Sequence, residues 1–171
     1  MKSVSVGKIG IPTLQSSTLS ADTSPESFTG CLMHVIHQVY VNIYKHLEQT
    51  LMNNKESLSL SQFMILVRFS CDDIVSITQS KLASDLMLTE ATISRHTRIL
   101  VAKKFLTKKK DAYNKKSFNL MLTPLGKKVF ENAKKIIMKE LIKYFSHINE
   151  SDKKMIIKHF TTTLSFLQQK K

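Results

Sequence analysis

The chain has 171 residues and a formal net charge of +13, from 26 lysines and arginines against 13 aspartates and glutamates. This length suits one domain with an appendage. No apolar run approaches the roughly eighteen residues of a membrane span, and the N-terminus lacks the continuous apolar segment of a secretory signal. Two cysteines are too few for a disulfide scaffold, so we expect a cytoplasmic protein.

The positive charge is concentrated in one part of the chain. Residues 78–128 contain twelve lysines and arginines against three acidic residues, a net charge of +9, which leaves +4 for the other residues. A generic solvated surface would spread its charge evenly, whereas a module that binds a polyanion concentrates it. The distribution therefore favours a nucleic-acid partner.

The first half of the chain predicts an arm and two helices. Residues 1–23 are rich in Ser and Thr without a sustained period, which indicates a flexible arm. Ser24 and Pro25 then start a long helix that runs to about Met52 with apolar residues at helical spacing. After a loop, a capping box of Ser59 and Gln62 opens a short apolar helix to about Ser70.

Two closely spaced helices follow, at residues 79–86 and 90–102, each preceded by a threonine N-cap. At 100° per residue, the second helix has an apolar face with His96 at its edge. That face carries Ile93, Thr97 and Leu100; the opposite face carries Ala91, Ser94, Arg95, Arg98 and Ala102. Small residues permit close approach to a DNA major groove, and arginine can pair with guanine or grip phosphate. Two of the three arginines of the chain are here.

The period of the pattern then changes from helical to alternating. Residues 106–110 and 118–122 predict two short antiparallel strands joined by a basic tip. Thr123 and Pro124 start another helix, and Asn149 caps a last one, which has an apolar stripe.

This order predicts a mainly α fold with a small β-hairpin wing: a winged helix-turn-helix domain plus N- and C-terminal dimerisation helices. The first and last helices are more apolar than one domain needs, which favours a homodimer in which they pack together. We expect an N-terminal arm over 1–23, a dimerisation helix over 24–57, a DNA-binding region over 58–128 and C-terminal dimerisation helices over 129–171.

Four blocks of the sequence resemble the MarR family of bacterial transcription regulators. They are residues 58–66 (LSLSQFMIL), 82–86 (LASDL), 92–100 (TISRHTRIL) and 122–126 (LTPLG). The resemblance implies a homodimer whose recognition helices enter successive major grooves of a pseudo-palindromic operator, with wings at the flanking minor grooves. It further implies a regulator, most often a repressor, that is released by a small ligand or by oxidation.

The chain departs from this family at two places. The family's wing usually carries Asp-x-Arg, and the matching residues here are Asn114, Lys115 and Lys116. Lysine supplies charge without the guanidinium fork, so the wing should discriminate sequence less. Lys104 stands where the family usually has glycine, which would cost on the order of 1 kcal/mol if the position needs a positive φ.

The DNA-binding candidates lie at a helix start, on the second helix of the pair, and on the wing. They are Thr78, Gln79, Ser80, Ala91, Thr92, Ser94, Arg95, Arg98, Lys110, Asn114, Lys115 and Lys116. Free N–H groups at a helix start favour phosphate. A solvated surface is the alternative interpretation for all of them.

Other candidate sites are weaker. Cys31 lies in the first turns of a long helix, where a thiol can act as a redox sensor, although a small core residue is the alternative. Aromatic and cationic residues could line a ligand crevice suited to a small aromatic carboxylate, with ordinary packing as the alternative. These residues are His37, Tyr40, Tyr44 and Arg68. We expect no metal site, because no acidic residue completes a set with His34 and His37.

The sequence contains no glycine-rich phosphate loop, nucleophile motif or paired carboxylates with a base, so we expect neither an enzyme nor a cofactor. The best interpretation is a sequence-specific regulator that binds double-stranded DNA. The alternatives are a nonspecific, architectural DNA-binding protein and a winged-helix module that docks on protein.

Overall fold

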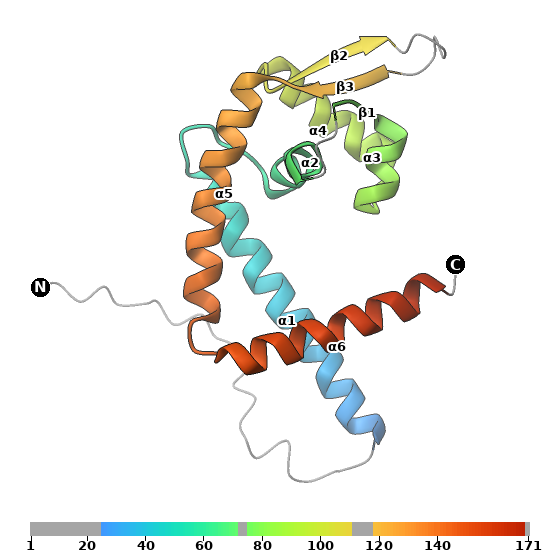
Figure 1. Ribbon diagram of the computed structural model, residues 1–171, viewed down its shortest axis with the longest axis vertical. Helices are drawn as coiled ribbons and strands as arrows, with labels where there is room; N and C mark the ends of the chain where they lie inside the picture. Colours follow the sequence, from blue (N-terminus) through green and yellow to red (C-terminus); the bar gives the residue numbers. More distant parts are fainter. Residues whose placement is uncertain (1–24, 72–74, 111–117, 170–171) are drawn as a thin grey trace, which may run out of the picture. The chain divides into compact units, whose positions relative to one another are not determined.

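The computed structural model describes residues 25–71, 75–110 and 118–169, and the fold is given for these residues (Figure 1). They form six α-helices and three β-strands. The elements are α1 (Pro25–Met52), α2 (Leu60–Cys71), β1 (Ile77–Thr78), α3 (Gln79–Leu86), α4 (Glu90–Ala102), β2 (Leu106–Lys110), β3 (Phe118–Leu122), α5 (Pro124–Phe145) and α6 (Glu150–Gln169). The mainly α fold with a β-hairpin wing is therefore confirmed. The arm over 1–23 and Asn114, Lys115 and Lys116 lie outside the described residues.

The caps predicted from the sequence form as hydrogen bonds. In the capping box, Gln62 N donates to Ser59 Oγ (3.1 Å) and Ser59 N donates to Gln62 Oε1 (3.2 Å). The threonines before α3, α4 and α5 each accept a backbone N–H of the first turn, and Asp152 N donates to Asn149 Oδ1 at the start of α6. Local side-chain chemistry thus decided where the helices begin.

The wing is part of a three-stranded antiparallel sheet with the order β1-β3-β2. β2 and β3 pair in the predicted hairpin, with Leu106 opposite Leu122 and Lys110 opposite Phe118. The additional strand β1 pairs Ile77 with Leu120. Two residues are too short to show an alternating pattern, so only the tertiary pairing reveals this strand.

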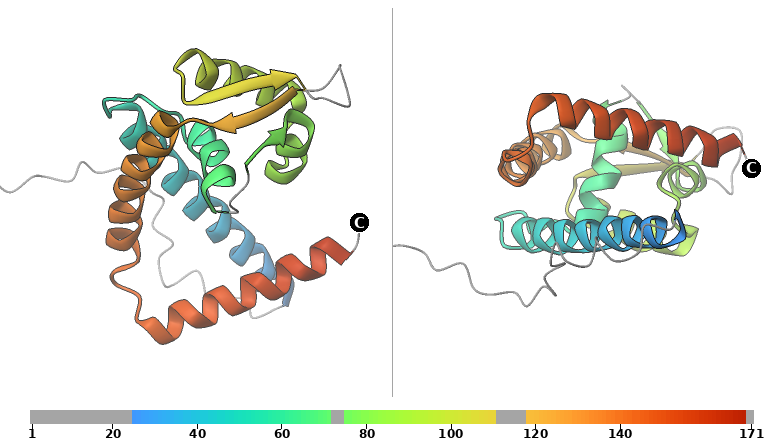
Figure 2. Two further views of the ribbon diagram at one scale, coloured as in Figure 1. Left: turned by 45° about the horizontal axis from the view of Figure 1, so that its top comes forward. Right: turned by 90° about the horizontal axis from the view of Figure 1, so that it is seen from below.

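The hydrophobic core surrounds α2, which contacts α3, α4, α5 and β3 (Figure 2). Ile65 and Leu66 of α2 have no exposed surface, and Phe63 stacks on Phe130 of α5 with the ring centroids 5.7 Å apart. Four more side chains are wholly buried: Leu82 of α3, Ile93 and Leu100 of α4, and Leu120 of β3. This shared core holds the two helices of the helix-turn-helix and the wing in one body.

The junction of α4, β2 and α5 is tightly tied. Lys104 has a φ of 60°, and Phe105 N donates to Leu100 O (2.9 Å), which closes the end of α4. Thr123 Oγ1 donates to Lys104 O (2.7 Å) and accepts from Gly126 N (2.9 Å). A Cβ on Gly126 would lie 2.1 Å from Phe105 O, so this position has room only for glycine.

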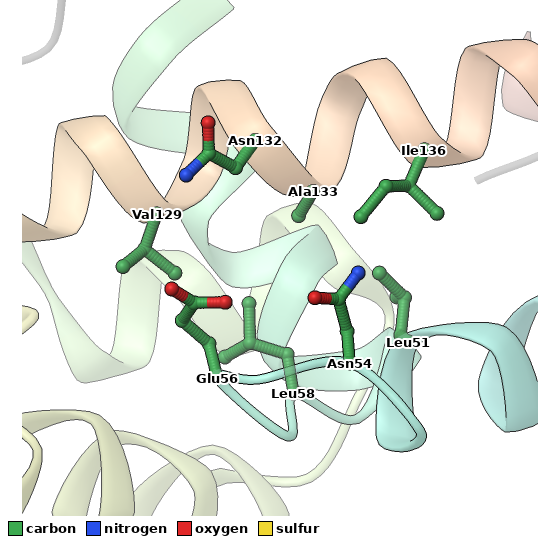
Figure 3. A pocket seen from close by; sticks show the side chains of 8 residues that line it. All are labelled: Leu51, Asn54, Glu56, Leu58, Val129, Asn132, Ala133 and Ile136. Carbon is green, nitrogen blue, oxygen red and sulfur yellow. The ribbon is translucent and has the colours of Figure 1, made fainter.

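The loop between α1 and α2 lies against α5 and forms a small hollow, shown in Figure 3. Its walls are Leu51, Asn54, Glu56, Leu58, Val129, Asn132, Ala133 and Ile136. Its cavity volume is about 10 Å³, roughly the space of a single water and far below that of a ligand pocket. The same loop is held to α4, because Lys103 Nζ donates to Glu56 O and Ser57 O, both at 2.9 Å.

Contacts divide the chain into residues 1–43 and residues 44–171. In the described part of the first unit, most apolar side chains of α1 are exposed, including Leu32, Val35, Val39 and Tyr40. In the second unit, none of residues 150–169 is buried, and Phe160, Leu164 and Leu167 of α6 are about half exposed. Among the described residues, no helix is long and apolar enough to cross a membrane.

Candidate nucleic-acid interface

The α4 helix separates its residues into a buried and an exposed face as the sequence predicts. Ile93 and Leu100 have no exposed surface, whereas Ala91, Arg95 and Arg98 are exposed. Thr89 Oγ1 accepts from Thr92 N (3.2 Å) and lies 2.9 Å from Thr92 Oγ1, which holds the first turn. The helix therefore presents two arginines from a rigid, anchored backbone.

Arg95 and Arg98 share this exposed face with small side chains. Ser94 is half-buried beside them, and Ala91 and Ala102 add no bulk. A face of this kind permits the close approach that direct reading of base edges requires.

The start of α3 supplies a second group of candidates. Thr78 Oγ1 accepts from Lys81 N (3.2 Å), and Ser80 is exposed. Gln79 differs from its neighbours, because its Nε2 donates to Thr97 Oγ1 of α4 at 2.8 Å. The NH₂ end of its amide is thus bound within the protein.

An ion-pair network fixes α3 against α2. Asp85 accepts from Arg68 Nη2 (2.8 Å) and lies 2.7 Å from Lys81 Nζ. The Lys81 ammonium, together with Arg68, holds the pKa of the Asp85 carboxyl below its usual value, despite its partial burial. Arg68, predicted to face a ligand crevice, is thus engaged by a carboxylate.

The wing brings further positive charge. Thr107, Lys108, Lys109 and Lys110 of β2 are all exposed. Lys108 Nζ lies 4.0 Å from the centroid of the Phe118 ring on β3, a cation–π contact across the hairpin. This contact restrains a side chain that would otherwise be mobile.

A hollow of about 150 Å³ lies between α3, α4 and the wing. It is lined by Gln79, Ser94, Thr97, Arg98, Val101 and Lys108. The structure thus brings together three candidates from two helices, Gln79 of α3 with Ser94 and Arg98 of α4. It adds Lys108 beside them, so the hollow has two cations and several hydrogen-bonding groups.

His96, at the edge of α4, stands in a less polar environment. Its Nδ1 is buried and has no hydrogen-bond partner within the described residues. Burial, assisted by the charge of Arg95, lowers the pKa of His96 below its ordinary value, although Glu48 opposes the shift. This shift favours the uncharged form of the imidazole.

The remaining candidates do not form a described site. His37 and Tyr40 belong to the first contact unit and Tyr44 and Arg68 to the second, so the crevice stays a prediction. Tyr44 has a local contact, with its hydroxyl 3.5 Å from Ser61 Oγ. Cys31 is half-buried with a free thiol, and its redox role also stays a prediction. Over the described ranges, no group of three or more His, Cys, Asp or Glu could hold a metal ion.

Sequence patterns missed the contacts that position the interface. The bond from Gln79 to Thr97 and the contact of Lys108 with Phe118 join residues of different elements. A polar residue on the apolar face of a predicted helix was the one available signal, because a buried hydroxyl needs a partner. Thr97 shows this signal, although its partner cannot be read from spacing.

Residues 58–118 match the MarR family. The match spans α2, α3, α4 and the described strands up to the first residue of β3. The chain carries a MarR-family domain. The prediction made from the four sequence blocks is thereby confirmed, and the hollow and the exposed face of α4 lie within the MarR-family region.

Three solved structures show how far the fold extends. A MarR transcriptional regulator from Methanosarcina mazei Go1 has 19% identity and a TM-score of 0.73, covering 83% of this chain and 99% of its own. MepR of Staphylococcus aureus in complex with DNA has 22% identity and a TM-score of 0.69, covering 78% and 96%. BpsR of Bordetella bronchiseptica, whose DNA binding is regulated by 6-hydroxynicotinic acid, has 18% identity and a TM-score of 0.67, covering 77% and 97%.

These likenesses show that the MarR fold extends beyond the matched region. No curated protein sequence is similar enough to this chain to match it. The family and the matched structures are of transcriptional regulators rather than enzymes, which agrees with the prediction that the chain is not an enzyme.

Proposed function

We propose that this MarR-family protein is a sequence-specific transcription regulator that binds double-stranded DNA. The observation that carries the proposal is the exposed face of α4. Arg95 and Arg98 project from a helix whose opposite face is buried, and the helix starts at a well-formed cap. A helix anchored in this way can enter a major groove without first becoming ordered.

The lysines supply most of the affinity in this proposal. Lys108, Lys109 and Lys110 extend the positive surface from α4 along the wing, and each phosphate contact releases counterions. Affinity should therefore fall steeply with salt. The two arginines of α4 supply most of the base reading, because lysine lacks the bidentate fork.

The protein acts on DNA as a homodimer in this proposal. In α6, Phe160, Leu164 and Leu167 have about half of their surface exposed, and a helix with an exposed apolar stripe depends on packing for its stability. A second copy would cover such stripes and would place two α4 helices on a pseudo-palindromic operator.

The proposal also includes an effector, a small ligand that releases the protein from DNA. The regulation of BpsR by 6-hydroxynicotinic acid supports a small aromatic effector. We propose that this protein is a cytoplasmic repressor released by such an effector or by oxidation of Cys31. Selection experiments repeated with phenolic acids and with peroxide test this part separately from DNA binding.

The central experiment selects bound sites from random DNA and then compares variants. Arg95→Ala should lower affinity for the selected operator by about 5- to 100-fold, the loss of one bidentate base contact, and affect random DNA far less. Lys109→Ala is the matched control, because loss of a phosphate contact weakens both DNAs evenly and flattens the salt dependence. An unchanged operator preference in Arg95→Ala would disprove the assignment of α4.

The alternative function is an architectural protein without sequence preference. The run Lys108–Lys110 favours it, because phosphate contacts carry no sequence information. The same experiment decides: a ratio of operator to random affinity near one in the unmodified protein supports the architectural function.

A further inference from the structure

Thr97 is a polar residue on the buried face of α4, with 1% of its surface exposed. Its Oγ1 donates to Ile93 O at 2.8 Å, with Ser94 O a second acceptor at 3.2 Å. A hydroxyl has one proton, and these backbone carbonyls cannot donate one. The Thr97 hydroxyl therefore donates its one proton within its own helix, and toward any other residue it can act only as an acceptor.

This direction determines how the amide of Gln79 is turned. Gln79 lies 2.8 Å from Thr97 Oγ1, and only the NH₂ end of an amide can donate to an acceptor. The Nε2 end must therefore point to Thr97, which leaves Oε1 on the other side. While the Thr97 hydroxyl keeps its bond to Ile93 O, turning the amide over would place two acceptors together in a part-buried site, which is unfavourable.

The fixed Oε1 belongs to a side chain that lines the hollow with Ser94, Arg98 and Lys108. A carbonyl oxygen does not bind phosphate, because both groups are acceptors. It does accept from the exocyclic amino groups of adenine and cytosine, which project into the major groove. The structure thus gives Gln79 a chemistry different from the phosphate contact expected of a helix start.

We propose that Thr97 is a positioning residue for DNA specificity: its buried hydroxyl orients the Gln79 amide, so that Gln79 Oε1 accepts from a base amino group. The proposal rests on the proposed DNA-binding function and deepens it. The hollow would then receive the edge of a base that presents a hydrogen-bond donor, next to the base that Arg98 reads.

A double-mutant cycle tests the proposal on the full chain. Thr97→Val keeps the shape of the side chain and removes the hydroxyl, so the amide of Gln79 can turn either way. Selection from random DNA should then lose its preference for adenine or cytosine at one position of each half-site. Affinity for the selected operator should fall by about 2- to 10-fold, the range for one hydrogen bond.

Gln79→Leu should remove the same preference at the same position. The double variant should lose no more than either single variant, because both changes break one bond. Thr97→Ser should restore the preference, since serine keeps the hydroxyl. Thr162→Val is the control, as Thr162 makes the same backward bond to Lys158 O (3.0 Å) on α6.

The outcomes distinguish a failure of the proposed DNA-binding function from a failure of the role proposed for Thr97. If the unmodified protein shows no base preference at any position, the proposed function fails. If preferences exist and Thr97→Val leaves all of them intact, only the role of Thr97 is overturned. It is also overturned if Thr97→Val weakens every DNA equally while lowering the melting temperature, since that marks a purely structural residue.

Discussion

The winged region, formed by α2 to α5 with the sheet, and the α6 helix both carry large apolar side chains, but they bury them to very different extents. In the winged region, Leu66, Leu82, Leu100 and Leu120 have no exposed surface. In α6, the leucines and the phenylalanine of the apolar stripe are about half exposed. The apolar side chains of the winged region pack against one another within one chain, whereas those of the α6 stripe are about half exposed among the described residues.

This difference shows where the packing that stabilises the described residues is located. Burying a leucine contributes roughly 1.5–3 kcal/mol, and the winged region obtains this from α2, α3, α4, α5 and the sheet together. The α6 helix has its N-terminal cap at Asn149, which contributes only about 1 kcal/mol. In the proposed dimer, a second copy would cover this stripe and stabilise the helix.

The largest expected effect is at Gly126. Gly126→Ala places a Cβ 2.1 Å from Phe105 O, so the α4–β2–α5 junction must open. We expect a loss of about 3 kcal/mol in the free energy of unfolding, measured by urea denaturation. Gly30→Ala is the matched control on α1, where the added Cβ meets no atom within 4 Å and helix propensity should increase. Equal effects at both sites would contradict the close approach.

The second prediction tests the exposed stripe. Leu164→Asp puts a charge on α6 where the proposed partner helix packs, so it should weaken the dimer by about 2 kcal/mol or more. Sedimentation at several protein concentrations measures the shift toward monomer. Thr162→Asp, on the opposite face of the same helix, should leave the oligomeric state unchanged. A Leu164→Asp protein that remains as dimeric as the original would rule out α6 as the interface.

The third prediction concerns the ion pairs that hold α3. Asp85→Asn should lower the free energy of unfolding by about 1 kcal/mol at pH 7. The folded pKa of Asp85 lies below its ordinary value of 3.8. The stabilisation is therefore fully present above pH 3.8 and is lost as the pH falls through the folded pKa.

Thermal unfolding of this Asp85 variant at pH 7 and at acid pH checks the dependence, with Glu131→Gln on the exposed face of α5 as the control. A difference between Asp85→Asn and the original protein that persists unchanged in strong acid would show that the carboxylate charge is not the cause.

The smallest expected effect is a gain in stability. Lys104 has a φ of 60°, a conformation that glycine adopts without strain, so Lys104→Gly should stabilise the winged region by up to about 1 kcal/mol. Lys104→Ala separates strain from charge, because it removes the ammonium and keeps the Cβ. If alanine stabilises as much as glycine, the backbone conformation is not responsible.

The sequence was informative wherever structure is decided locally. Thr89 and Thr123 marked helix starts because their hydroxyls accept a nearby N–H. The alternation after Ala102 predicted a hairpin because side chains in a strand alternate between two faces. It could not reveal β1, whose two residues have no period of their own and exist as a strand only through pairing with β3.

The candidate site shows the same limit. The arginines of α4 were predictable from helical spacing, since 100° per residue separates them from Ile93 and Leu100. The hollow was not, because Gln79, Arg98 and Lys108 come from three elements whose approach depends on the shared core.

By itself, the sequence determined the order of the helices and the hairpin, the helix boundaries and the exposed arginines, because periodicity and capping act over a few residues. Only the tertiary structure decided that Gln79 donates to Thr97, that Lys108 lies over the Phe118 ring and that Gly126 has no room for a side chain. These are contacts between elements, and their geometry depends on how the helices and the sheet pack around α2.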